Sequence, residues 1–197
     1  MISDIRILNY QLLSSLFYDV PNELQLKDYL LITKRLSEIC DKDTRNELHF
    51  LNNRIESVLD KDLNQIAVEY SKLFLLPNGV VPYASCYLDG KKLLKQESWE
   101  QVKDFYMKLG WKIDEDENYL ADHISVELAF MAKLVEECDK KVQNQFFNSF
   151  LITWLPSLFQ DIKNKEISYF YYAVACFGDA FIKKEQNRIW DGGVKNG

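Results

Sequence analysis

The chain has 197 residues; 47% of them are hydrophobic and 27% are charged, shares that are ordinary for a soluble globular protein and exclude wholesale disorder. This length favours a single domain that buries a core without disulfide or metal staples. The 24 basic and 30 acidic residues give a net charge of −6. Nucleic acid is therefore not an expected partner, because no surplus of cations is present to meet phosphates.

The cysteines and the apolar runs indicate a reducing, aqueous compartment. No C-x-x-C motif occurs, and with only two histidines in the chain a metal site is not expected. The cysteines stand far apart, at Cys40, Cys86, Cys138 and Cys176. Polar residues interrupt the N-terminal segment, so it lacks the apolar block of a signal peptide, and no apolar run is long enough for a membrane span. We expect a cytoplasmic protein with no stable membrane insertion.

The first part of the chain predicts consecutive helices. Neither Gly nor Pro occurs between Asn22 and Leu76, and apolar residues recur there at helical spacing. Pro21 ends the first helix, Asn22 caps the second, and Pro77 ends the fourth. The expected helices are Ser3–Tyr18, Asn22–Cys40, Leu48–Leu59 and Leu63–Phe74.

A long segment from Pro77 to Gln96 breaks this pattern. It contains two of the four prolines and two of the seven glycines, including an Asp89-Gly90 turn. It also carries apolar and aromatic residues, namely Val80, Val81, Tyr83, Tyr87 and Leu88. Loops of this length in a compact domain are often functional. We therefore expect an ordered, functional loop.

Helices resume after this loop. Ser98 is a candidate cap for a helix that Gly110 closes, and an acidic turn follows at Asp114–Glu117. Asp122 occupies the N-cap position of the next helix, which extends to Val135. Further helices are expected at Val142–Trp154, from Pro156 as a new or kinked helix, and at Ile167–Ile189. The prediction is one all-α domain over residues 1–190, a bundle of about eight helices with one long central loop, and a flexible tail over 191–197.

Motifs of classical catalysis are missing. A di-metal carboxylate site needs Glu-x-x-His, but Asn46 precedes His49 at that spacing and Leu120 precedes His123. No Gly-rich phosphate loop and no G-x-S-x-G elbow occurs.

Two candidate sites remain: the segment Tyr70–Tyr87 and the pair Asp122-His123. By residue type alone, a packed loop and a helix cap with a satisfied histidine are the favoured interpretations. The alternative is a polar pair that lines a groove for a cationic segment.

Three blocks of the sequence resemble the TorD-like family, which includes the TorD, DmsD and NarJ branches. They are Y-S-K-L-F-L-L-P-(x4)-P-Y-x-S-x-Y over Tyr70–Tyr87, D-H-I-x-x-E-L-x-F-M from Asp122, and W-L-P from Trp154 ahead of an aromatic-rich helix. The D-H-I-x-x-E-L block is the most specific. Many family members have a proline and an acidic residue just before the Asp-His pair, where this chain has Leu120 and Ala121.

The resemblance implies a cytoplasmic chaperone without catalytic turnover. Family members bind the twin-arginine leader of an apo-molybdoenzyme, and often the enzyme body, and hold it for molybdopterin insertion before export. Carboxylates pair well with arginine forks, so Asp122 and the turn Asp114–Glu117 would meet the arginines. The apolar part of the leader would lie in a groove walled by Tyr83, Tyr87 and Leu88. The leader-binding residues so implied are Tyr83, Ser85, Tyr87, Asp122, His123 and Glu127.

Some family members bind GTP and some form domain-swapped dimers. This sequence has no nucleotide loop, so no cofactor is predicted, and a monomer and a domain-swapped homodimer both remain open. Two other functions are weighed against the chaperone: a helical adaptor or regulator of another protein complex, and a metal-free helical enzyme that uses Asp122 and His123. The client molybdoenzyme is not specified by the sequence.

Overall fold

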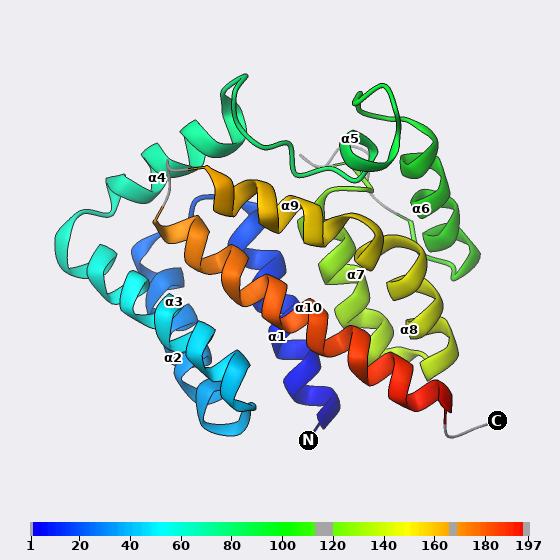
Figure 1. Ribbon diagram of the computed structural model, residues 1–197, viewed down its shortest axis with the longest axis horizontal. Helices are drawn as coiled ribbons and strands as arrows, with labels where there is room; N and C mark the ends of the chain where they lie inside the picture. Colours follow the sequence, from blue (N-terminus) through cyan, green and yellow to red (C-terminus); the bar gives the residue numbers. More distant parts are fainter. Residues whose placement is uncertain (1, 113–119, 166–168, 195–197) are drawn as a thin grey trace.

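The computed structural model describes residues 2–112, 120–165 and 169–194, with the backbone alone for Ile2 and residues 190–194 (Figure 1). The elements are α1 (Ile2–Tyr18), α2 (Glu23–Ile39), α3 (Lys42–Lys61), α4 (Asn64–Tyr70), η1 (Ser71–Leu75), α5 (Ser85–Leu88), α6 (Glu97–Lys108), α7 (Ile124–Glu137), α8 (Lys140–Phe146), η2 (Phe147–Leu151), α9 (Ile152–Asn164) and α10 (Phe170–Val194). Eight longer helical segments and one single-turn helix, α5, pack around a common core in the described ranges; α4 with η1, and α8 with η2 and α9, each count as one continuous segment. No strand occurs in this described part of the chain, so the all-α prediction is confirmed.

Side-chain caps fix the starts of the helices in the first part of the chain. Asn22 caps α2 as expected: its side chain accepts from Gln25 N, and the Gln25 side chain accepts from Asn22 N in return. Asp41 caps α3 by accepting from Thr44 N at 3.0 Å, so α3 begins at Lys42, ahead of its apolar run. These caps satisfy backbone donors that have no partner within the helix.

Two expected helix starts are wrong. Ser98 is not a cap, because α6 already begins at Glu97; the Ser98 hydroxyl instead donates to Asp89 of the preceding turn. Of the two alternatives for Pro156, the start of a new helix is wrong, because the proline lies inside α9. A proline ring inside a helix clashes with the carbonyl group four residues earlier, which here belongs to Ile152. The wider π-helical turn η2 ends directly before Ile152, and α8, η2 and α9 continue as one helix.

The longest helices form the frame of the bundle. Helix α1 packs along α7, α2 packs on α3, and α10 lies across the molecule against both α3 and α9 (Figure 1). Many of the largest buried side chains are aromatic, with Trp154, Phe146 and Phe159 fully enclosed. Helix α10 runs to Val194, so it includes the start of the expected tail; residues 195–197, Ile167 and the acidic turn Asp114–Glu117 lie outside the described residues.

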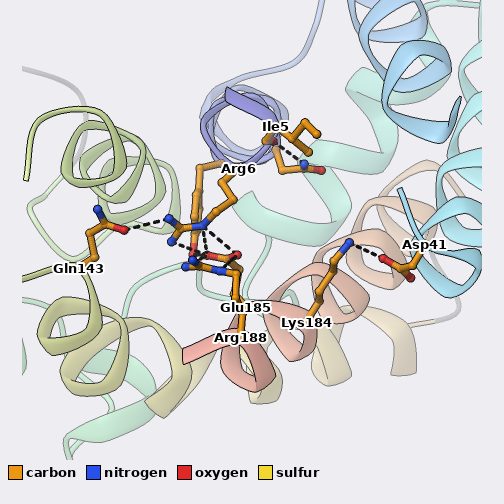
Figure 2. Close-up of polar contacts among 9 residues, drawn as sticks. Ile5, Arg6, Asp41, Gln143, Lys184, Glu185 and Arg188 are labelled. Carbon is orange, nitrogen blue, oxygen red and sulfur yellow. Dashed lines mark hydrogen bonds and ion pairs between the residues drawn. The ribbon is translucent and has the colours of Figure 1, made fainter. Parts of the chain in front are cut away.

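A buried charged cluster joins the first and last helices (Figure 2). Arg6 of α1 donates to both oxygens of Glu185 in α10, and its Nη1 donates to Gln143 of α8 at 2.9 Å. Tyr10 and Arg188 complete the shell around the same carboxylate. Each of the three Arg6 nitrogens donates to a buried acceptor, and loss of a charged partner from such a cluster is costly because the other charge stays buried. This cluster fixes α1, α8 and α10 relative to one another.

No helix in the described ranges is both long enough and apolar enough to cross a membrane.

Candidate functional site

The central loop begins with a close backbone approach at Gly79. Val80 N donates to Leu73 O at 2.6 Å, and Gly79 N donates to Leu76 O at 2.9 Å. A Cβ at Gly79 would stand 2.2 Å from Leu73 O, so a side chain does not fit there. The π-helical segment η1 and this turn therefore reverse the chain and send it over α9, as Figure 1 shows.

The loop is then joined to the segment that leads into α7. Ala84 N donates to Asp122 O and Ile124 N donates to Pro82 O, each at 3.0 Å, so that Tyr83 and His123 form an isolated antiparallel bridge. Their rings also meet edge to face, with centroids 4.8 Å apart. Two blocks that are distant in sequence are thus held together by backbone bonds and by an aromatic contact.

Asp122 is a helix cap, but not of α7 as predicted. Its Oδ2 accepts from Ser85 N at 2.9 Å, and Ser85 is the first residue of α5. The cap of α7 is instead His123, whose Nδ1 accepts from Ser125 N at 3.2 Å. Asp122 therefore satisfies an N-terminal donor of a helix 37 positions earlier in the chain, where Ala84 has no side-chain acceptor. The sequence pattern pointed to α7 because that helix directly follows Asp122; it carries no signal for a contact with a distant helix.

Glu127 and Trp154 link α7 to α9 beneath the loop. Trp154 Nε1 donates to Glu127 Oε2 at 2.9 Å, and both side chains are fully buried. The Trp154 ring packs against Tyr87 of α5, with centroids 5.6 Å apart. All three sequence blocks therefore meet in one cluster, which we call the loop anchor and define as Ser85, Asp122, His123, Glu127 and Trp154.

Burial sets the protonation of the loop anchor. It lowers the pKa of His123 to about 3, so the imidazole is neutral and its Nδ1 is free to accept as a cap. Burial raises the pKa of Asp122, and it raises that of Glu127 well above the usual range, with the neighbouring Asp122 charge adding to the effect. One oxygen of each carboxyl, Asp122 Oδ1 and Glu127 Oε1, has no hydrogen-bond partner among the described residues. Burial thus disfavours the charged form of both carboxyl groups.

Tyr83 and Tyr87 are the partly exposed members of the predicted site. The Tyr87 hydroxyl donates to Asp161 Oδ2 of α9 at 3.1 Å. Burial, and after it the charge and the hydrogen bond of Asp161, raise the pKa of Tyr87 above its usual range. Ser85, Asp122, His123 and Glu127 are buried, with exposed fractions of 1% or less. The structure thus brings all six predicted residues together, with two at the surface and four beneath it.

Large apolar side chains are exposed in the same part of the chain as these tyrosines. We call them the loop surface and define it as Leu75, Leu76, Val81, Leu88, Leu93 and Leu94. Leu88 is the last residue of α5, directly after Tyr87, and is 42% exposed. Concentration of exposed apolar residues in one segment is typical of a surface that binds a partner.

Comparison with known proteins places this arrangement in a family. A family model described as the nitrate reductase delta subunit matches residues 39–160, which contain all three sequence blocks. The chain belongs to this TorD-like family. The chaperone protein TorD of Vibrio cholerae is 27% identical over 212 residues, covering 95% of this chain and 96% of that protein. The TorD chaperone of Shewanella pealeana is 28% identical over 203 residues, with 93% and 89% covered.

The fold of the TorD-like chain also has a solved counterpart. A crystal structure from Archaeoglobus fulgidus, described as a redox enzyme maturation protein, superposes with a TM-score of 0.56 at 20% identity and covers 91% of this chain and 93% of its own. This likeness supports the fold. The TorD relatives are named chaperones and not enzymes, which agrees with the prediction of a protein without catalytic turnover.

Two features of the site were missed from the sequence. Trp154 was identified only as part of a motif, although it is the donor to Glu127. Asp161 had no signal at all, because an exposed acid on a helix is commonplace and its contact with Tyr87 spans 74 positions.

Proposed function

We propose that this TorD-like chaperone binds the twin-arginine leader, the apo form, or both, of a molybdopterin-dependent oxidoreductase and holds it for cofactor insertion before export. The family membership and the three sequence blocks support this function. The structural observation that carries it is the loop surface, an exposed apolar segment held in place by buried hydrogen bonds. The apolar part of a leader would bury these side chains, and burial of apolar area drives association.

The predicted residues take two different roles in this proposal. Tyr83 and Tyr87, together with Leu88, contact the leader. Ser85, Asp122, His123 and Glu127 hold the loop in its shape, because their polar atoms face the interior and not the solvent. This division replaces the expectation that the Asp122 carboxylate itself meets an arginine.

Titration calorimetry tests the proposal. The probe is a synthetic leader peptide from a molybdoenzyme subunit of the same genome, with its two arginines and its apolar segment. We expect binding, and we expect replacement of both arginines by Gln to weaken it, more so at low salt, where exposed charges are screened less. The proposal would be contradicted if the peptide without its arginines and the peptide without its apolar segment each bound as tightly as the intact leader.

Leu88→Ser should weaken leader binding about tenfold or more, because a side chain of this size contributes about 1.5–3 kcal/mol when it is fully buried. The matched control is Leu24→Ser, since Leu24 is 69% exposed on α2 and lies outside the loop surface. Calorimetry of both variants checks this, with thermal melting to show that both are folded. An unchanged affinity for Leu88→Ser, or an equal loss in the control, would remove the loop surface from the leader site.

The second candidate is a helical adaptor of another complex. The same exposed loop surface favours it, because apolar surfaces serve many partners. It differs in one measurable respect: the arginines of a leader would not matter to its binding.

A further inference from the structure

We infer that Asp161 of α9 is the carboxylate that receives an arginine of the leader. This inference rests on the proposed function and names a specificity-determining residue within it. The residue was not among the predicted site residues. It is exposed, it lies on the helix beneath the loop, and a tyrosine of the loop holds its side chain in place.

The loop runs along α9 with Asp161 between its two points of contact. At one end Lys165 Nζ donates to Asn78 O at 2.6 Å, and at the other the Tyr87 ring packs on Trp154. Asp161 lies two helical turns after Trp154, and the Tyr87 hydroxyl bridges that distance. A peptide that lies against Tyr87 and Leu88 would therefore pass next to the Asp161 carboxylate.

The bond from Tyr87 orients this carboxylate without using its full capacity. The hydroxyl donates to Oδ2 alone, and an ionised carboxylate has about four acceptor positions on its two oxygens. A guanidinium group binds such a carboxylate through two parallel hydrogen bonds. A leader that covers Tyr87 would also shield this carboxylate from solvent, and such shielding strengthens a charged pair.

The charge of Asp161 also distinguishes it from the other carboxylates of this region. Among the described residues, no lysine or arginine forms an ion pair with it, and Lys165 turns to the Asn78 carbonyl instead. Asp179 of α10, in contrast, is paired with Lys163 at 2.8 Å and with Lys183 at 3.0 Å. Asp122 is buried, and its carboxylate accepts a hydrogen bond from Ser85 N. Asp161 is thus an exposed acid that the Tyr87 hydroxyl positions and that no ion pair among the described residues neutralises.

A double-mutant cycle tests the assignment. Asp161→Asn keeps an acceptor for Tyr87 but removes the charge, and each leader arginine is replaced by Gln in turn. With the unaltered protein we expect one of these replacements to lower affinity about tenfold; with Asp161→Asn the same replacement should change affinity by less than about threefold. Tyr87→Phe should give a partial loss, because it keeps the ring on Trp154 but releases the carboxylate. The control is Asp60→Asn, an exposed acid on α3, which should behave as the unaltered protein.

The outcomes separate the inference from the function on which it rests. If the unaltered protein binds the leader in an arginine-dependent way and Asp161→Asn shows the same dependence, the assignment of Asp161 is overturned and the proposed function stands. If no leader binds to the unaltered protein, both are overturned. Loss of arginine dependence in Asp161→Asn, with an unchanged melting temperature, supports the inference.

Discussion

Replacing Trp154 by alanine is expected to lower the free energy of unfolding by about 3–5 kcal/mol. The side chain is fully buried, its ring packs on Tyr87, and its Nε1 is the donor to Glu127. The substitution leaves a large cavity and removes the partner of a buried carboxyl group, and both effects are unfavourable. Since single domains are stable by about 5–15 kcal/mol, this change removes a large share of the total. Urea unfolding, followed by circular dichroism, measures it.

Two further variants separate the cavity from the hydrogen bond. Trp154→Phe keeps much of the ring volume but has no donor, so it should cost about 1–3 kcal/mol. Glu127→Gln keeps an oxygen that accepts from Trp154 and removes the ionisation that burial opposes, so it should cost less than either tryptophan substitution. A loss of under about 1 kcal/mol for Trp154→Ala would show that the loop anchor does not hold α5, α7 and α9 together.

Acidification is expected to destabilise the protein through His123. Its pKa is about 3 in the folded protein and about 6.5 in the unfolded chain, so the unfolded chain binds the proton more tightly. The stability that the neutral imidazole provides is complete above pH 6.5 and is lost as the pH falls towards 3. Between pH 7 and pH 5 this loss is about 2 kcal/mol. Protonation would also remove the acceptor that caps α7 at Ser125 N.

The test compares pH dependences and not absolute stabilities. His123→Asn keeps a good N-cap residue and has no titrating ring, so its unfolding free energy should fall by about 2 kcal/mol less than that of the unaltered protein between pH 7 and pH 5. His49→Asn, on the exposed face of α3, is the control and should follow the unaltered protein. Parallel curves for the unaltered protein and His123→Asn would mean that the folded protein accommodates the imidazolium.

The helices were predictable because their signals are local. Asn22 and Gln25 are three residues apart, and Gly110 adopts the positive φ of +81° that ends a helix. The partners in the loop anchor were not predictable in the same way, because they are set by packing between distant segments. Asp122 was correctly seen as a capping residue, but the donor it meets is Ser85, not one in its own helix. The local pattern indicated that this residue caps a helix, but only the fold shows which helix it caps.

The same limit applies to the binding residues. The sequence placed Tyr83, Tyr87, Asp122 and Glu127 in one site because their motif blocks belong together, and the structure does bring them together. However, Asp122 and Glu127 are buried whereas Tyr83 and Tyr87 are partly exposed. The burial of a polar residue near a helix start cannot be predicted from the residues next to it in the chain. The exposed carboxylate beside Tyr87 belongs to Asp161, which is outside every motif.

Hydrogen–deuterium exchange of the full chain with and without a twin-arginine leader tests the central claim most directly. The claim is that the leader lies on the loop surface and along α9. We predict that the leader slows exchange of backbone amides in residues 77–96 and in the exposed turns of α9 around Asp161, and leaves α2 and α3 unchanged. Slower exchange confined to α2 and α3, with the loop unaffected at saturating leader, would contradict the account.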